Sequence, residues 1–260
     1  MDVVVDDKLP TQNGRLIYLH NNVDQNEMFG PLLEKAYAKL NYCYEYLIGG
    51  NACDALIDLT GGVNETYQLK KANGPEDSNY MEPNKLWEFI FESYAHKSLA
   101  SASIEVKGGK KLEGVEDNGL VLGHAYGILQ VYELLNKNGS FSALRQPKEP
   151  AGDKSIKLLK LRNPWGQVNP KTPWNGRWCQ GAKDWSQVSD QIKQAIGANK
   201  QEDGEFFISL EDFMRLFDNM DIVRVDFNMG NNNSKWEIQQ FDGAWVPGKN
   251  AGGKLFFTLN

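Results

Sequence analysis

The chain has 260 residues, of which 41% are hydrophobic, and it includes 7 Trp, 10 Tyr and 12 Phe, so a folded core is expected rather than a disordered tail. The formal net charge of −6 comes without any block of Lys and Arg, which argues against nucleic acid as a partner. No run of about 18 apolar residues occurs, so no membrane span is expected.

Cysteine usage indicates a reducing compartment. Cys43, Cys53 and Cys179 are widely spaced and odd in number, which does not suggest a disulfide framework or a zinc site. The first residues lack the basic start and the apolar stretch of a signal peptide. The expected location is therefore the cytoplasm.

The first part of the chain is predicted to be mainly helical. Two short strands joined by a loop are expected at residues 3–5 and 16–20. Apolar residues at spacings of three and four then predict helices, each closed by glycines or by a change of pattern. These helices are expected at residues 28–47, 53–59 and 86–99.

The second part is predicted to be mainly β-structure. Strands are expected at residues 103–106, 120–134, 156–162, 206–208 and 222–227, with a polar loop at 136–154. One helix, 210–217, has a predicted cap formed by Ser209 with Asp212. This order predicts an α+β protein in which a helical piece precedes a mainly antiparallel sheet.

His124 is the histidine whose surroundings favour a chemical role. It lies in an apolar strand between Gly123 and Ala125, and such small neighbours leave room for a substrate against the imidazole. A core histidine with satisfied hydrogen bonds is an equally good interpretation of these residues alone.

Asn163 follows the strand predicted at 156–162, which Pro164 and Gly166 terminate, so the side chain is expected at the strand tip. A strand tip suits a side chain that orients another group, although Asn-Pro is also an ordinary turn starter. Trp165, between the proline and the glycine, suggests a shield over something polar.

A thiol protease needs a thiolate, a histidine that moves protons, and a polar group that orients the histidine. In papain-like enzymes these residues come in the order Cys, His, Asn. His124 and Asn163 match the last two, so the cysteine is expected upstream of both.

Several stretches resemble the protease core of the calpain family, in the family's order and over nearly the whole chain. They are VVVDDKLPT (3–11), LLEKAYAKL (32–40), TGG (60–62), GHAY (123–126), LRNPWG (161–166), GRW (176–178) and EDGEF (202–206). The resemblance implies a papain-like fold in which His124 is the general base, Asn163 orients it and Trp165 packs beside the active site.

The resemblance also implies a division of the chain. Residues 1–60 correspond to the later half of the first, helical core subdomain, and 61–228 to the second subdomain with His and Asn. Residues 229–260 then correspond to a linker and the start of a calpain-type β-sandwich.

The family's nucleophile lies in a Gln-Gly…Cys-Trp stretch that would precede Val3, and this sequence does not contain that stretch. Cys43 is expected near a helix C-terminus, where the dipole disfavours a thiolate. Cys53 has no Trp after it, and Cys179 follows both partners. The chain is therefore predicted to be a fragment without its nucleophile, inactive alone.

The resemblance to calpains also implies an enzyme that is activated when two calcium ions bind its core. Glu27 matches a ligand of the first site, and Asp203 with Glu205 matches two ligands of the second. Pro173 and Gln180 occupy the positions of two further acidic ligands, so the second site is expected to be weakened or lost, with Asp184 or a carbonyl as a substitute.

The resemblance implies a calcium-dependent, intracellular cysteine endopeptidase that carries out limited proteolysis of protein substrates. A regulatory subunit or an inhibitor protein is an implied partner. The alternatives are a non-catalytic calpain-like module that binds proteins, and a different papain-like hydrolase with the same His and Asn.

Overall fold

The computed structural model describes residues 2–21, 24–71, 80–109, 111–152, 154–166, 174–200, 204–225 and 243–244. The helices are α1 (Phe29–Leu40), α2 (Ala52–Thr60), α3 (Pro83–Ala95), α4 (Asp190–Ala195) and α5 (Leu210–Leu216), with 3-10 helices η1 (Tyr44–Leu47) and η2 (Lys183–Gln187). The strands are β1 (Thr11–Gln12), β2 (Arg15–Leu16), β3 (Val63–Gln68), β4 (Leu99–Ile104), β5 (His124–Lys137), β6 (Ser140–Leu144), β7 (Ile156–Arg162), β8 (Glu205–Ser209) and β9 (Asn219–Arg224). No helix among these residues has the length and apolar character needed to cross a membrane.

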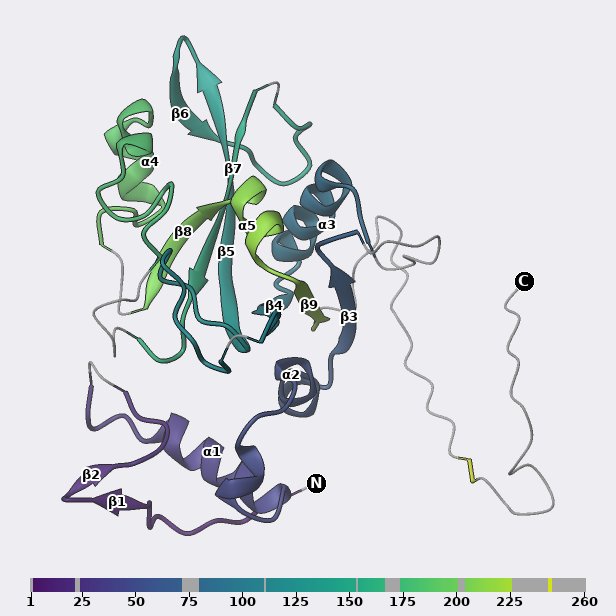
Figure 1. Ribbon diagram of the computed structural model, residues 1–260, viewed down its shortest axis with the longest axis vertical. Helices are drawn as coiled ribbons and strands as arrows, with labels where there is room; N and C mark the ends of the chain where they lie inside the picture. The colour runs from purple at the N-terminus through teal and green to yellow at the C-terminus, as the bar shows by residue number, and fades with distance from the viewer. Residues whose placement is uncertain are drawn as a thin grey trace.

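A seven-stranded sheet forms the body of the molecule (Figure 1). Its strands run in the order β3-β9-β4-β5-β7-β8, with β6 paired to the far end of β5, and every pairing is antiparallel. The predicted α+β class with a mainly antiparallel sheet is therefore confirmed.

The sheet carries a hydrophobic core on each face. Side chains alternate along β7, so Leu159 and Leu161 face α3 and α5, whereas Leu158 faces the opposite way. On that opposite face, Leu158 joins a cluster with Phe207 and two tryptophans, Trp178 and Trp185, whose rings meet edge to face. Both faces of β7 are thus packed, which fixes the strand that leads to Asn163.

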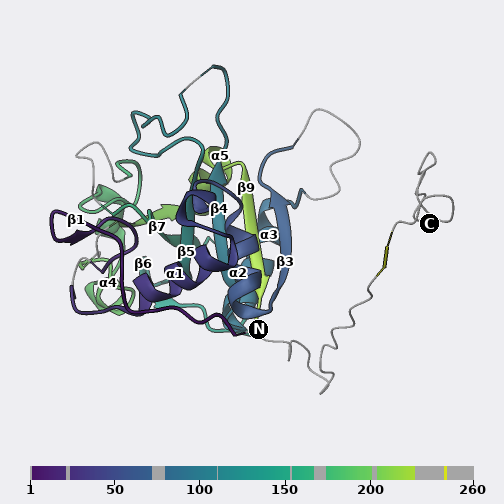
Figure 2. The ribbon, with the colours of Figure 1, turned by 90° about the horizontal axis from the view of Figure 1, so that it is seen from below.

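Residues before Val63 lie at one end of the molecule. Contacts from α2 reach β9 and β4, whereas α1 and the β1–β2 hairpin lie beyond α2, away from the sheet (Figure 1). In the view from below, α1 and the hairpin lie in front of the sheet (Figure 2). Asn51 caps α2 by accepting a hydrogen bond from the Cys53 amide, and Gly61, with φ of 68°, ends the helix. This helix agrees with its prediction to within one residue at each end.

Several predicted elements are wrong in extent. The helix predicted over 28–47 ends at Leu40, because Tyr42 adopts a left-handed backbone with φ of 79°. The strands predicted at 3–5 and 16–20 are replaced by the short β1–β2 hairpin, whose Asn13-Gly14 turn has φ above zero at both residues. The polar loop predicted at 136–154 contains β6, and β3 was not predicted. The β-sandwich expected from residue 229 falls almost wholly outside the described residues and stays a prediction.

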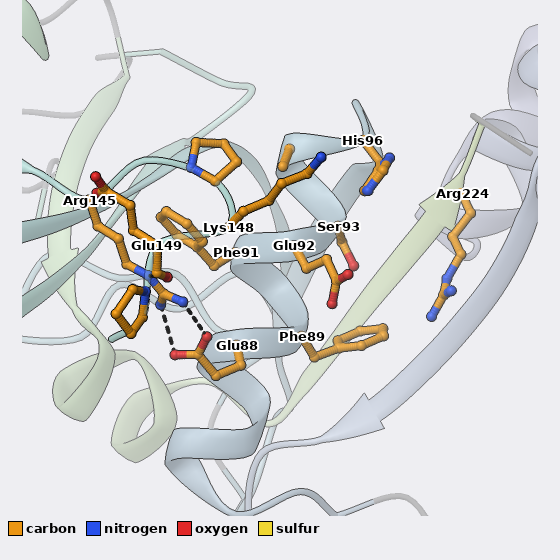
Figure 3. Close-up of a pocket in the computed structure, with 13 residues that line it drawn as sticks. Glu88, Phe89, Phe91, Glu92, Ser93, His96, Arg145, Lys148, Glu149 and Arg224 are labelled. Carbon is orange, nitrogen blue, oxygen red and sulfur yellow. Dashed lines mark hydrogen bonds and ion pairs between the residues drawn. The ribbon is translucent and has the colours of Figure 1, made fainter. Parts of the chain in front are cut away.

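A buried polar network joins α3 to the sheet. Glu133 of β5 is fully buried and accepts hydrogen bonds from Trp87 Nε1 and Arg145 Nη1, both at 2.8 Å, and from the Ser155 hydroxyl at 2.5 Å. Arg145 also forks onto Glu88 of α3, as Figure 3 shows beside a cavity of about 850 Å³. Because three hydrogen-bonded segments converge on one carboxylate, α3 is fixed against β5.

Candidate active site

His124 opens β5, and the residue before it sets its position. Gly123 has φ of 63°, and its amide donates to the Ile104 carbonyl at 2.7 Å. A Cβ at Gly123 would lie 2.3 Å from Leu112 Cδ1, so a side chain there would displace the neighbouring loop. The small residue that the sequence places before His124 therefore lets this loop approach the strand.

Asn163 lies one residue beyond β7, and the pairing of β7 with β5 brings it to His124. Asn163 Oδ1 is 2.9 Å from His124 Nε2, although the two residues are 39 apart in sequence. The same Oδ1 accepts the Trp165 amide N–H at 3.0 Å. The structure thus places the two residues that the sequence analysis paired within hydrogen-bonding distance.

These two contacts determine the imidazole tautomer. Because a backbone N–H donates to it, the Asn163 atom at this position is the amide oxygen rather than the nitrogen. An amide oxygen accepts only, so His124 Nε2 carries the hydrogen in this contact. In the neutral ring, Nδ1 then holds the lone pair and is the nitrogen that accepts a proton.

Two aromatic rings enclose the imidazole. Trp165 lies with its ring centre 4.2 Å from that of His124, and Tyr126 meets the imidazole edge-on at 5.1 Å. Burial lowers the pKa of His124 below its ordinary value, while the hydrogen bond to Asn163 and the charge of Glu113 oppose that shift. The histidine is therefore held mainly in its neutral, proton-accepting form near pH 7.

Gly204 was not singled out as a site residue from the sequence, yet it holds the Asn163 backbone. Its carbonyl accepts the Asn163 amide N–H at 2.9 Å. A Cβ on Gly204 would lie 2.5 Å from the Asn163 carbonyl oxygen and 2.9 Å from Gly166 Cα. The interpretation of EDGEF (202–206) as a calcium motif concerns Asp203 and Glu205 and gives no signal for the steric role of Gly204.

Tyr126, the last residue of the GHAY motif, is a site residue that the sequence alone does not indicate. It is buried, and its hydroxyl accepts the Val121 amide N–H at 2.8 Å. Burial raises its pKa to about 12, so the phenol stays neutral. Tyr126 supports the ring of His124 and fixes the segment that enters β5.

Two of the three cysteines lack the setting of a nucleophile. Cys53 is buried at the start of α2, and burial raises the pKa of its thiol. Burial also raises the pKa of Cys179, whose thiol contacts the Gln180 carbonyl at 3.7 Å. Cys43 directly precedes η1. A nucleophilic cysteine needs a lowered thiol pKa, so the raised values argue against Cys53 and Cys179.

Glu27, the residue matched to the first calcium site, directly precedes the first turn of α1. One oxygen of its carboxylate accepts the amide hydrogens of Phe29 and Gly30. Anionic oxygens at a helix N-terminus are stabilised by unpaired amides and the helix dipole. A carboxylate has two oxygens, so this capping role leaves capacity for a cation.

The residues matched to the second calcium site are engaged differently. The Glu205 carboxylate lies 2.7 Å from Lys160 Nζ. Asp184, the substitute ligand considered from the sequence, pairs with Arg177 at 2.9 Å, and Gln180 is exposed. Asp203 and Pro173 lie outside the described residues. Where the chain is described, no three His, Cys, Asp or Glu side chains form a metal-binding group. These contacts do not supply the cluster of free oxygens that calcium prefers.

Comparison with known proteins gives the family. Residues 1–224 match the model of the calpain family cysteine proteases. The chain belongs to this family. It is 36% identical to Calpain-A of Drosophila melanogaster, and 38% identical both to Calpain-8 of Homo sapiens and to Calpain-9 of Rattus norvegicus. Each alignment covers 97% of this chain.

The chain spans 28%, 32% and 33% of the lengths of these three calpains, respectively. The resemblance seen in the sequence motifs and the papain-like α+β fold that it implied are both confirmed. Membership in a cysteine protease family gives the chemical context for the histidine–asparagine contact at the tips of β5 and β7.

Proposed function

We propose that this chain contributes the histidine–asparagine half of a calpain-type cysteine endopeptidase. His124 is the base and then the acid, Asn163 orients it, and Trp165 shields their hydrogen bond from water. The observation that carries the proposal is the 2.9 Å contact from His124 Nε2 to Asn163 Oδ1, with the oxygen identified by the Trp165 amide.

The geometry supports a defined proton path. His124 Nδ1 takes the proton of the attacking thiol, and the thiolate adds to the peptide carbonyl carbon. The imidazolium then returns that proton to the leaving amine as the C–N bond breaks, which leaves a thioester. In the second stage Nδ1 takes a proton from water, the hydroxide adds to the thioester, and the thiol leaves with the proton.

The nucleophile in this proposal belongs to a segment that would precede Val3, as the family resemblance implies. The raised thiol pKa values of Cys53 and Cys179 support its assignment to neither of these two residues. We therefore expect the chain alone to lack peptidase activity.

Control, partners and location are further parts of the proposal. Protein substrates, with a regulatory subunit or an inhibitor protein, are the proposed partners. The proposed location is intracellular, in line with three free cysteines. Calcium dependence of the whole enzyme is proposed to enter through the first core half, where Glu27 lies.

The proposal is tested with a chimera that places a calpain's Gln-Gly…Cys-Trp segment before Val3. We expect the chimera to hydrolyse casein and a fluorogenic peptide, while the chain alone does not. His124→Ala should abolish hydrolysis, and His96→Ala, in a histidine at the end of α3, is the matched control that should retain it. Full hydrolysis by the His124→Ala chimera would contradict the assignment.

A non-catalytic protein-binding module is a second candidate, favoured by exposed apolar side chains before Val63. Phe29 is 75% exposed and Tyr42 is 89% exposed, and exposed apolar groups of this kind often mark an interaction site. A chimera that folds, judged by circular dichroism, yet hydrolyses neither substrate would favour this second function.

A further inference from the structure

A buried ion pair lies on the β7–β8 edge of the sheet. Lys160 Nζ and the Glu205 carboxylate are 2.7 Å apart, and their side chains are only 16% and 6% exposed. In the register of these strands, Lys160 lies opposite Phe207 and Arg162 lies opposite Glu205, so the pair is diagonal on one face. The lysine ammonium also lies 5.9 Å from the Phe207 ring centre.

A carboxylate as buried as that of Glu205 requires a nearby positive charge, because an isolated buried charge is strongly unfavourable. Lys160 supplies that charge from the neighbouring strand. A calcium ion on the same oxygens would have to displace the ammonium or share the carboxylate with it, and the two cations would repel each other.

Asp184, the substitute ligand considered from the sequence, is also paired with a cation. Asp184 pairs with Arg177 Nε at 2.9 Å, and its side chain is largely shielded. Gln180 is exposed and neutral at a position where the family resemblance expects an acid. Among the described residues, two acidic side chains considered as calcium ligands, Glu205 and Asp184, are thus each paired with a cation of the protein.

The pair also lies beside the candidate active site. Glu205 directly follows Gly204, whose carbonyl accepts the Asn163 amide and whose Cα packs against the Asn163 backbone. Lys160 is three residues before Asn163 on β7. The two charged residues therefore fix both strands at the point where the tip that carries Asn163 begins.

We propose that Lys160 supplies the positive charge that the family resemblance assigns to the second calcium ion, so the His124–Asn163 half is held together without metal. This inference rests on the proposed function, because that function gives the His124–Asn163 contact its importance. Its test does not use peptide hydrolysis. Lys160 is a positioning residue that acts through Glu205 and Gly204 on Asn163.

The first test is calcium binding to the unmodified chain. We expect the unmodified chain and Glu205→Gln to give the same difference in melting temperature between calcium chloride and EGTA, and the same terbium luminescence excited through tryptophan, because any response from the region of Glu27 persists in that variant. A saturable calcium-dependent rise in melting temperature that Glu205→Gln removes would overturn the proposal.

The second test compares lysines of similar burial. Lys160→Met should lower the melting temperature by roughly 6–12 °C, because it leaves a buried carboxylate unpaired. Lys160→Arg and the double variant Lys160→Met with Glu205→Gln should recover most of that loss. Lys193→Met is the matched control, since Lys193 is 19% exposed but its partner Asp190 is 94% exposed, and it should change little.

A readout at the site separates positioning from general stability. Below the melting transition, the imidazole resonances of His124 should shift in Lys160→Met and stay unchanged in Lys193→Met. Unchanged His124 resonances in Lys160→Met, or a melting temperature equal to that of the unmodified chain, would overturn the proposal. If Lys160→Met does not fold, Lys160→Arg and the calcium titration of the unmodified chain still decide it. Failure of the protease proposal would appear in the chimera assay and leave these measurements unaffected.

Discussion

The residues before Val63 and the sheet that follows differ in how they bury apolar side chains. Two hydrophobic clusters fill the faces of the sheet and extend over α3, α4 and α5. In the described residues before Val63, buried side chains are few and small, such as Pro31, Ala38 and Cys53. Larger apolar side chains there are exposed, among them Phe29, Tyr42 and Ile48.

This contrast indicates that the sheet that positions His124 and Asn163 obtains most of its buried side chains from residues after Val63. The histidine and asparagine are positioned by β5, β7 and Gly204, all of which belong to the packed sheet. In the region before Val63, apolar side chains such as Phe29 and Tyr42 are exposed and do not pack against the sheet. Paired variants in the two regions measure whether the stability of the sheet depends on the residues before Val63.

The largest contrast is expected from two phenylalanines. Phe207→Ala should lower the free energy of unfolding by about 4 kcal/mol, because it empties a fully buried position. Phe29→Ala should change it by less than about 0.5 kcal/mol, because that ring is mostly exposed. Urea denaturation followed by tryptophan fluorescence measures both. Equal effects would contradict the contrast between the two regions.

The buried network around Glu133 should give the next largest effect. Arg145→Met should lower the free energy of unfolding by about 3 kcal/mol, because Glu133 loses its cation. Arg215→Met, which breaks the exposed pair with Asp212 in α5, should cost no more than about 0.5 kcal/mol. Denaturant titrations of the two variants give the comparison.

The same network predicts a dependence on pH. Burial alone would raise the pKa of Glu133, but hydrogen bonds from Ser155, Arg145 and Trp87 lower it below its ordinary value. A lowered carboxyl pKa stabilises the fold above the ordinary value, and this stability is lost as pH falls through the folded-state pKa. Arg145→Met should therefore weaken the acid sensitivity of unfolding. If the free energy of unfolding falls with decreasing pH equally in both proteins, Arg145 does not contribute to the acid sensitivity.

A smaller effect is expected from two glycines with the same backbone angle. Gly204 has φ of 77° and Gly181 has φ of 78°, so Ala is similarly strained at both positions. A Cβ at Gly204 would strike the Asn163 carbonyl, whereas one at Gly181 would meet nothing within 4 Å. Gly204→Ala should therefore cost about 1–3 kcal/mol more than Gly181→Ala and shift the His124 resonances. Equal costs would show that Gly204 does not hold Asn163.

The smallest effects concern the titration of His124, measured by NMR of its imidazole. In the chain alone, the midpoint should lie below 6.5, because burial lowers the pKa. Asn163→Ala should lower it further by removing a hydrogen bond that favours the charged form, and Trp165→Ala should raise it by admitting water. Shifts of equal sign in the two variants would contradict these separate roles.

The titration has a defined effect on stability. Because the folded-state pKa of His124 is lowered, the unfolded chain binds more protons between that pKa and 6.5. The contribution of neutral His124 to stability is therefore complete above 6.5 and is lost as pH falls through the folded-state pKa. His124→Ala should remove this part of the pH dependence.

Much of the fold followed from local patterns. The strand predicted at 156–162 matches β7, which ends just before Asn163 and Pro164. The apolar side chains of this strand pack on both faces of the sheet. The cap of α5 was also predicted, and the Ser209 hydroxyl accepts the Asp212 amide at 3.2 Å. The helix over 28–47 was too long, since its apolar spacing continues past Tyr42, where the backbone turns left-handed.

The site was predictable as a list of residues but not as a set of contacts. The order of His124 and Asn163 matched a family pattern, whereas their distance depends on the pairing of β5 with β7. The sequence has Pro173 and Gln180 where the family resemblance expects acidic ligands, and the weakening of that site stays a prediction. The pairing of Lys160 with Glu205 depends on the register of β7 against β8, and no local pattern encodes that register.

The β5–β6 turn offers a permissive position for a reporter. It is made by Asn138 and Gly139, both with φ above zero, at the opposite end of β5 from His124. A strand of 14 residues places that turn up to about 40 Å from the imidazole. A fluorophore attached there would follow unfolding of the sheet without touching the candidate catalytic pair, and labelling chemistry could avoid the three native cysteines.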